Sequence, residues 1–266
     1  MIMGCHLWPK SFERWNKNGF ILETLDSIKI RDLEVSVYQS LSGYRFSLDA
    51  LLLADFPDIK ACRNILEMGS GSGVVSLLLA KRYPRAKVTG IELQESLFSR
   101  AARSAEANGL SDRVRFIHAD LRKLPKTLPH EGFDMAVMNP PFRRPGTGRI
   151  SPGDERARAR HELTAGLPEI LKAAFAMLKN RGRLCLVYNP DRLPELLAGM
   201  KARGLEPKRM RTVHSFEGDR ARMALVEAVK SGAPGFKVMP PLFVYSAPGE
   251  YSPEMREFYG FSPLPT

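Results

Sequence analysis

The first regular pattern along the chain is an alternation of branched apolar and polar residues between positions 23 and 40. It runs on both sides of Arg31-Asp32, and period-two alternation around a polar turn predicts a short β-hairpin. The segment from Ser47 to Phe56 changes to a broad apolar face behind a capping serine, which predicts a helix. The apolar positions of the expected hairpin are Ile28, Ile30, Val35 and Val37.

Downstream of this helix, short apolar runs alternate with helical segments. Strands are expected at residues 64–68, 87–92, 114–118, 133–139 and 183–188. Helices are expected at residues 73–83, 96–108, 163–179 and 191–201. Strand–helix alternation predicts a parallel sheet with helices on both faces. The last strands, expected at 209–214, 221–229 and 242–245, follow one another with little helix between them, which indicates an antiparallel edge.

Composition narrows the class of protein. The 266 residues include 40 Lys+Arg and 29 Asp+Glu, a formal net charge of +11 that favours a polyanionic partner. Nucleic acid is the usual partner of this kind, and an anionic membrane surface is the alternative. Cys5, Cys62 and Cys185 are far apart, so neither a disulfide framework nor a zinc site is expected. Neither a signal peptide nor a membrane-spanning run is evident, so we expect a soluble cytoplasmic protein. We also expect no bound metal.

A glycine-rich turn, Glu67-Met-Gly69-Ser-Gly71-Ser-Gly73, directly follows the first expected parallel strand and begins a helix. Glycine lets the backbone turn tightly and approach a ligand, and the helix N-terminus offers free N–H groups to an anion. Dinucleotide-binding folds space their glycines as GxGxxG, whereas here the third glycine comes one residue early. The turn therefore favours a ligand with a single carboxylate and a nearby ammonium, as in S-adenosylmethionine.

Two further carboxylates end the next two strands. Glu92 follows Gly73 by 19 residues, at a position where its carboxylate can accept hydrogen bonds from both ribose hydroxyls. Asp120 ends the third strand, where it could accept a hydrogen bond from an adenine amino group. Acids at the ends of three successive strands support one nucleoside-binding edge.

The tetrapeptide Asn139-Pro140-Pro141-Phe142 follows the fourth strand. An aromatic NH2 group is a poor nucleophile, and acceptors aimed at its two hydrogens stabilise the positive charge that develops during attack. The Asn139 side-chain oxygen and the Pro140 carbonyl can be these acceptors, and the prolines hold them rigidly. Phe142 offers a flat face for a stacked base, worth about 1–3 kcal/mol. The chemistry requires this tetrapeptide and the glycine turn to lie at the same edge of the sheet.

These motifs resemble those of the class I S-adenosylmethionine-dependent methyltransferases of the NPPF/NPPY group. Within that group the chain is similar to the bacterial valine-tRNA adenine-N6 methyltransferases, over residues 24–260. Besides the motifs above, the resemblance rests on residues 43–49, 159–162 and 240–245. It implies a Rossmann-like α/β fold with a mostly parallel seven-stranded sheet, an antiparallel edge strand and helices on both faces. We expect the chain to divide into an N-terminal extension with the hairpin at 1–42, whose first part has no recognised match, and a methyltransferase domain at 43–266.

The resemblance further implies methyl transfer from S-adenosylmethionine to N6 of an adenine in RNA, with tRNA near the anticodon as the target. Asn139, Pro140, Pro141 and Phe142 are then the catalytic residues. The implied cofactor-binding residues are Tyr44, Arg45, Phe46, Asp49, Glu67, Gly69, Ser70, Gly71, Gly73, Glu92, Leu93, Asp120, Leu121 and Asn139. In contrast to many relatives, which have a second aromatic residue after the phenylalanine, this chain has Arg143.

Two clusters of basic residues fit an RNA partner. The first follows the catalytic tetrapeptide and could hold phosphates while a base leaves its stack; it comprises Arg143, Arg144, Arg149, Arg156, Arg158 and Arg160. The second has no assigned role and comprises Lys201, Arg203, Lys208, Arg209 and Arg211.

Other functions remain open at the level of sequence. A protein-glutamine N5-methyltransferase acting on release factors is one alternative, because an amide NH2 group is a poor nucleophile in the same way as an aromatic one. Such enzymes usually carry a helical domain before the glycine turn. A non-catalytic RNA-binding relative would be expected to have lost the glycines or Asn139, and both are present. A small-molecule substrate does not account for the arginines, and the sequence does not separate RNA from DNA.

Overall fold

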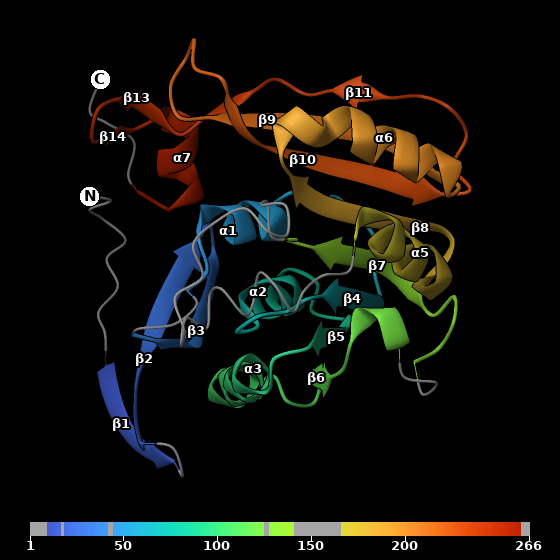
Figure 1. The fold of residues 1–266 in the computed structure, drawn as a ribbon. Coiled ribbons are helices and arrows are strands. Elements are labelled where there is room, and N and C mark those ends of the chain that lie inside the picture. The colour runs from blue at the N-terminus through green and yellow to red at the C-terminus, as the bar shows by residue number, and fades with distance from the viewer. Residues whose placement is uncertain (1–9, 17–18, 42–44, 125–127, 141–165, 262–266) are drawn as a thin grey trace.

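The computed structural model describes residues 10–16, 19–41, 45–124, 128–140 and 166–261, and it describes side chains from Glu23 onward. Its main feature is a nine-stranded sheet with helices on both faces (Figure 1). Strand β4 (Asn64–Met68) lies between β5 (Lys87–Glu92) and β7 (Phe133–Met138), and all three are parallel. The predicted α/β class is therefore confirmed.

The other strands extend this centre in both directions. The order is β11-β9-β10-β8-β7-β4-β5-β6, with β12 also paired to β9. The bounds are β6 Val114–His118, β8 Leu178–Tyr188, β9 Leu205–His214, β10 Ala221–Lys230, β11 Lys237–Val238 and β12 Leu242–Phe243.

Two details of the predicted sheet were wrong. The antiparallel strand β10 lies between β8 and β9 rather than at the edge, and it pairs with both. The sheet also has nine strands rather than seven, because the two-residue strands β11 and β12 add alongside β9. Strands this short carry too few residues to produce a readable alternation.

The helices begin and end close to the predicted positions. They are α1 Leu48–Asp55, α2 Val74–Arg82, α3 Glu95–Ala107, α5 Leu167–Met177, α6 Leu193–Ala202 and α7 Pro253–Phe258. Helix α5 ends at Met177, two residues before the predicted end, because β8 starts at the next residue. Helix α7 was not predicted. No described helix is long and apolar enough to cross a membrane.

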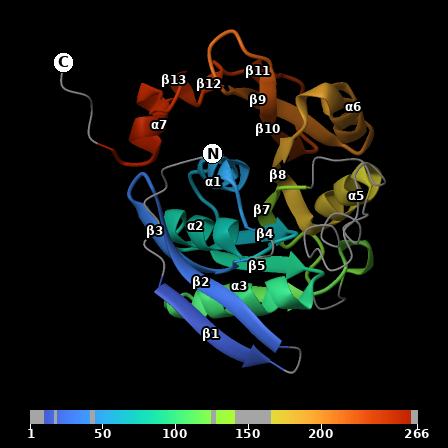
Figure 2. The same cartoon turned by 60° about the vertical axis from the view of Figure 1, so that its left-hand side comes forward.

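The predicted hairpin is present and packs onto the helices. Strands β2 (Gly19–Ile30) and β3 (Leu33–Ser40) pair antiparallel around the Arg31-Asp32 turn, and β1 (Lys10–Asn16) adds a strand that was not predicted. Figure 2 shows this small sheet lying over α2 and α3. Because the hairpin shares its core with these helices, a division of the chain after residue 42 stays a prediction.

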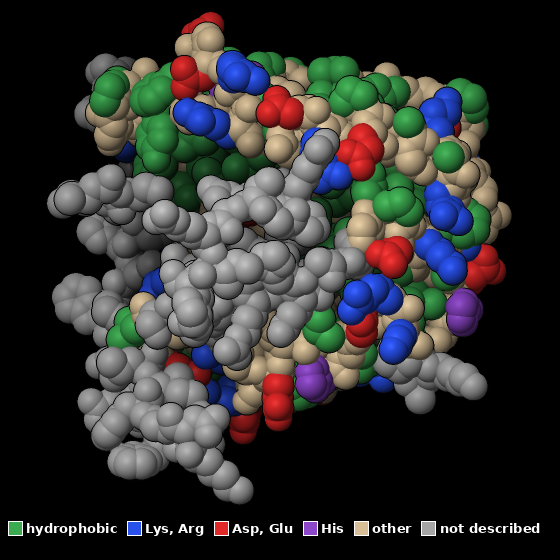
Figure 3. Space-filling view, viewed as in Figure 1, with side chains coloured by type: hydrophobic (Ala, Val, Ile, Leu, Met, Phe, Trp, Pro, Cys, Tyr) green, Lys and Arg blue, Asp and Glu red, His purple; other side chains and the backbone are tan. Residues whose placement is uncertain are grey.

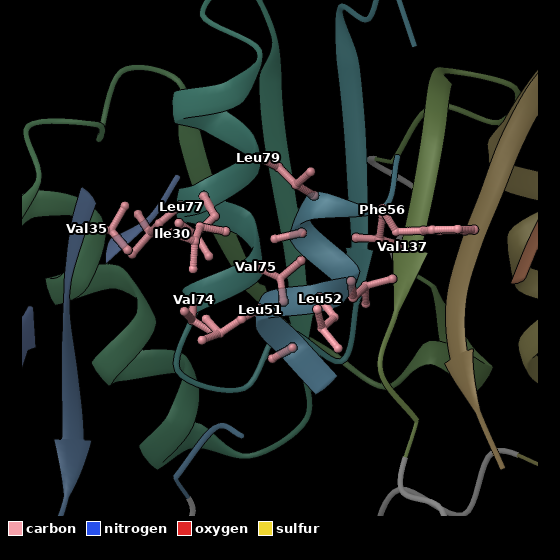
Figure 4. Close-up of a cluster of buried hydrophobic side chains, with 14 of the residues drawn as sticks. Ile30, Val35, Leu51, Leu52, Phe56, Val74, Val75, Leu77, Leu79 and Val137 are labelled. Atoms are coloured by element: carbon pink, nitrogen blue, oxygen red, sulfur yellow. The ribbon is translucent and has the colours of Figure 1, made fainter. Parts of the chain in front are cut away.

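Each face of the main sheet has its own apolar core. One core joins the hairpin with α1 and α2, where Val35, Leu51 and Val75 lie in one cluster (Figure 4). The other joins α5 and α6 to the opposite face of β7, β8 and β10. Cys62 and Cys185 belong to the first core and are buried free thiols.

Candidate active site

The glycine turn and the Asn139 corner lie at the same edge of the sheet. Strands β4 and β7 are parallel neighbours with Glu67 opposite Val137. Gly69 and Asn139 each follow two residues later, so they leave adjacent strands side by side, about 4.8 Å apart in the direction across the sheet. On the other side of β4, Met68 pairs with Ile91, which places Glu92 next to the same turn. The arrangement that methyl transfer requires is therefore present.

The glycine turn needs glycine for its conformation. Gly69, Gly71 and Gly73 have φ values of 76°, 55° and 88°, in the left-handed region that other residues rarely adopt. The N–H groups of Gly69 and Ser70 donate to the Ile91 carbonyl at 2.8 and 2.9 Å. The turn is thus attached to the end of β5, and Gly73 begins α2 immediately behind it.

The Glu67 side chain accepts hydrogen bonds from the first turn of α2, directly behind the glycine turn. Its Oε2 accepts hydrogen bonds from the backbone N–H of Ser76, at 2.8 Å, and from the Ser76 hydroxyl. The side chain is buried, and burial raises the pKa of the carboxyl to about 8, with a smaller contribution from nearby Glu92. Ser76 is in the first turn of α2, so Glu67 caps the helix that follows the glycines. The contact between Glu67 and a cofactor stays a prediction.

Glu92 joins the glycine turn to the turn that follows β5. Its Oε2 accepts from the Gly71 N–H and its Oε1 from the Gln94 N–H, both at 2.8 Å. Burial raises the pKa of this carboxyl, and the backbone donors oppose that shift. The Leu93 N–H is a third backbone donor to this carboxylate, whose two oxygens have four lone pairs, so one acceptor position remains for a ribose hydroxyl.

Asp120 is held differently from the other two acids. The guanidinium of Arg122 donates to Asp120 Oδ2 from Nε at 2.9 Å and from Nη2 at 2.6 Å. This ion pair lowers the pKa of the Asp120 carboxyl. An adenine amino group would therefore have to share Asp120 with Arg122. The predicted apolar neighbours Leu93 and Leu121 are half-buried and buried, respectively.

The Asn139 side chain presents a buried acceptor. Its Oδ1 is enclosed and accepts no hydrogen bond from any described residue. The next residue, Pro140, is buried and continues the extended backbone. A buried amide oxygen without a donor costs about 1–3 kcal/mol, so an incoming N–H group would be stabilised there.

Other unpartnered polar atoms lie on the turns at this edge. Within the described part of the chain, the Ser70 and Ser72 hydroxyls and the Gln94 Nε2 are buried without hydrogen-bond partners. Buried polar groups normally have partners, so a cluster of exceptions indicates a ligand site. The sequence analysis missed Ser72 and Gln94. Their signals were a position between two glycines and a position two residues after Glu92.

The segment before α1 is attached to the hairpin. Asp26, which is 1% exposed, accepts from Gln39 Nε2 at 2.5 Å and from Arg45 Nη2 at 2.6 Å. Gln39 Oε1 also accepts from the Phe46 N–H at 3.3 Å. Asp49 is turned back to Ser47, whose hydroxyl donates to it at 2.5 Å.

Several predicted site residues lie outside the described residues. They are Tyr44, Pro141, Phe142, Arg143, Arg144, Arg149, Arg156, Arg158 and Arg160. Their roles in binding the cofactor or the RNA stay predictions. In the part of the chain that is described, no group of three or more His, Cys, Asp or Glu side chains could hold a metal ion.

Comparison with known proteins agrees with this geometry. A family model described as methyltransferase small domain matches residues 48–198. A tRNA1(Val) (adenine(37)-N6)-methyltransferase of Porphyromonas gingivalis (strain ATCC BAA-308 / W83) is 29% identical over 229 residues, which cover 83% of this chain and 89% of that protein.

Solved structures share the fold. The crystal structure of a protein of Agrobacterium tumefaciens, described as a predicted O-methyltransferase, superposes with a TM-score of 0.63 at 23% identity and covers 80% of this chain and 95% of that one. A geranyl diphosphate methyltransferase in complex with SAM superposes with a TM-score of 0.52 at 15% identity, covering 68% and 84%.

Proposed function

The chain belongs to the methyltransferase small domain family, and we propose that it transfers the methyl group of S-adenosylmethionine to the N6 amino group of an adenine in tRNA. The name of the Porphyromonas gingivalis relative states this reaction at adenine 37. We extend that target, an adenine beside the anticodon, to this chain. Because tRNA is a cytoplasmic substrate, this function also places the protein in the cytoplasm.

One observation carries the proposal: the buried Oδ1 of Asn139, which accepts no hydrogen bond from the described residues, lies beside the glycine turn at the end of the adjacent parallel strand. An acceptor without a donor suits an NH2 group, which brings two donors. A hydroxyl substrate would bring one donor, and a carbon nucleophile would bring none. The neighbouring Pro140 carbonyl is a second acceptor in a rigid backbone.

The residues of the glycine turn fit the donor. Ser70, Ser72 and Gln94 offer buried polar groups without partners among the described residues, and Glu92 keeps an acceptor position for a ribose hydroxyl. Bound S-adenosylmethionine supplies a methyl group already activated by its positively charged sulfur. The chain therefore needs to supply position and electrostatics rather than a covalent intermediate.

Asn139 then acts on the nucleophile. Accepting a hydrogen bond from the amino group pulls the nitrogen away from conjugation with the ring and makes its lone pair available for attack. The same acceptor stabilises the positive charge that develops on nitrogen as the N–C bond forms. The charged product nitrogen readily loses its extra proton, so no dedicated base is required.

Direct identification of the product tests the proposal. The protein is incubated with methyl-labelled S-adenosylmethionine and either total tRNA or ribosomal release factors, and the tRNA is then digested to nucleosides for mass spectrometry. We expect N6-methyladenosine in the tRNA digest. Label found only in the release factors would instead assign glutamine as the target and overturn the proposal.

A further inference from the structure

Basic side chains gather at the amino edge of the main sheet, opposite the edge that carries Asn139. Two adjoining depressions of about 460 and 540 Å³ lie there and share Asp58 at their border. We name them together the amino-edge trough. Its basic lining residues are Lys60, Arg63, Arg82, Arg85, Arg181, Arg183, Lys208, Arg209 and Lys237.

The charge of the trough is far from balanced. Nine cationic side chains stand against two carboxylates, Asp58 and Glu227, a formal surplus of +7 where the whole chain has +11. The face seen in Figure 3 differs, because acidic and basic side chains alternate there over α5 and α6. Among the described residues, the trough therefore carries a local positive surplus that the face over α5 and α6 lacks.

Most of these cations are available to a ligand. Arg183 and Arg209 pair with buried Glu227, and Arg82 pairs with Asp55. The other six form no salt bridge with any described carboxylate. Of these, Arg181 and Lys208 donate to backbone carbonyls, which leaves their charge uncompensated.

The trough is elongated across the strands from β8 to β11. Lys237 on β11 is opposite Arg209 on β9, whereas β10, between β9 and β8, contributes Glu227 and Val229. Since neighbouring strands are about 4.8 Å apart, this part of the trough extends about 14 Å. Phe236, 41% exposed, lines the trough beside Lys237 and offers a face for stacking. An elongated depression with several cations and an aromatic side chain suits a phosphodiester backbone better than one small anion.

We infer that the amino-edge trough binds the phosphate backbone of the RNA substrate, away from the nucleotide held at Asn139. This inference rests on the proposed function. Strand β4 has five residues, so the two edges are about 17 Å apart. An A-form RNA stem together with its loop is longer than this separation, so the stem can contact the trough while one base of the loop reaches the opposite edge.

The test is the double variant Arg181→Gln/Lys237→Gln, compared with Lys29→Gln/Arg115→Gln. Both pairs remove one exposed lysine and one exposed arginine, and Arg115 donates only to the Thr89 hydroxyl, much as Arg181 donates only to a carbonyl. Binding of fluorescent tRNA is measured by anisotropy over a range of salt concentrations. Each lost phosphate contact lowers the slope of log Kd against log salt by about 0.7–0.9, so the trough variant should lose about 1.5 and the control variant nothing.

Cofactor binding and kcat, measured on the same variants, distinguish a failure of the trough inference from a failure of the proposed function. The trough variant should bind S-adenosylmethionine like the parent and reach the parent kcat at saturating tRNA, because neither residue lies near the catalytic edge. A trough variant with the parent salt slope, in a protein that methylates tRNA, would overturn this inference alone. A parent protein that methylates no RNA would overturn the proposed function, whatever the trough binds.

Discussion

At the scale of single residues, the candidate site consists of acceptors that are positioned before a ligand arrives. Asn139 Oδ1 is enclosed and has no donor among the described residues, and Glu92 accepts from three backbone N–H groups with one acceptor position left over. Groups fixed in this way need little rearrangement during the reaction, which is the main advantage of a preorganised site.

The buried carboxyl of Glu67 makes the stability of the protein depend on pH. Its pKa is raised from 4.5 to about 8 by burial, so the folded protein keeps a proton that the unfolded chain releases. The free energy of unfolding should therefore fall as the pH rises from about 4.5 to about 8. Glu67→Gln removes this titration. Relative to the parent, the variant should gain at least about 3 °C in Tm between pH 5.5 and 8, roughly 1 kcal/mol for a chain of this size.

The control for this prediction is Glu217→Gln, at an exposed carboxyl that has no part in the glycine turn. Its Tm should stay parallel to that of the parent over the same pH range. A constant difference in Tm between the Glu67 variant and the parent would contradict the raised pKa of Glu67.

The residue types at the site could be predicted from the sequence, but their partners could not. Gly69, Glu92 and Asn139 follow strands whose ends must meet, so their shared edge is a consequence of parallel topology. The hydrogen bonds from Ser76 to Glu67 and from Arg122 to Asp120 depend on side-chain rotamers, which the spacing of residues in the sequence does not predict.

At the scale of elements, the glycine turn depends on the close packing of the strands beneath it. A Cβ on Gly90 of β5 would lie 2.5 Å from Phe116 Cδ1 and 2.9 Å from Ser70 Cβ. Gly90→Ala should therefore push Ser70 out of place, destabilise the protein by about 1–3 kcal/mol and weaken S-adenosylmethionine binding at least tenfold. Calorimetry measures both quantities.

The second variant for this prediction is Gly90→Ala/Phe116→Leu. Removing the ring relieves the shorter contact, so part of the stability should return, and the two changes should be non-additive. Gly90→Ala with the parent Tm and the parent affinity for the cofactor would show that the turn tolerates displacement.

The hairpin also contributes to the site, through the segment that precedes α1. Asp26 accepts hydrogen bonds from the side chains of Arg45 and Gln39, and Gln39 in turn accepts from the Phe46 N–H. If this segment covers the cofactor, Asp26→Asn should raise the KM for S-adenosylmethionine about fivefold or more and leave kcat within about twofold, because a hydrogen bond to a charged group contributes about 1.5–3 kcal/mol. Steady-state kinetics at saturating RNA provide both values.

The matched control is Asp32→Asn in the exposed turn of the same hairpin. It changes the same chemical group without touching Arg45, so its KM should equal that of the parent. Equal KM values for both variants would remove the hairpin from the cofactor site.

The elements themselves could largely be predicted, since period-two and helical patterns mark the hairpin, the parallel strands and the helices α1, α2, α3, α5 and α6. Patterns failed where elements are short or adjoin without a break. Strand β8 starts at Leu178 directly after α5, and β11 has only two residues. The place of β10 between β8 and β9 is set by long-range pairing, which local pattern does not report.

At the scale of the whole molecule, the sheet separates two tasks between its edges. The carboxyl edge carries the acceptors and the glycine turn, and the amino edge carries the trough. A substrate that contacts both edges must be long enough to reach from one to the other, and the basic trough favours one that is negatively charged along its length. RNA has both properties.

The central claim is that Asn139 acts on the nucleophile and not on the cofactor, and Asn139→Ala tests it most directly. Asn189 is the matched control, because it directly follows the adjacent strand β8, and among the described residues its side-chain oxygen accepts only from the Asp191 N–H. Methyl transfer to tRNA is measured in single turnover and S-adenosylmethionine binding by calorimetry. We predict that Asn139→Ala binds the cofactor like the parent but transfers methyl at least about 10²–10³ times more slowly, while Asn189→Ala keeps the parent rate. An Asn139→Ala protein that turns over at the parent rate would contradict the account.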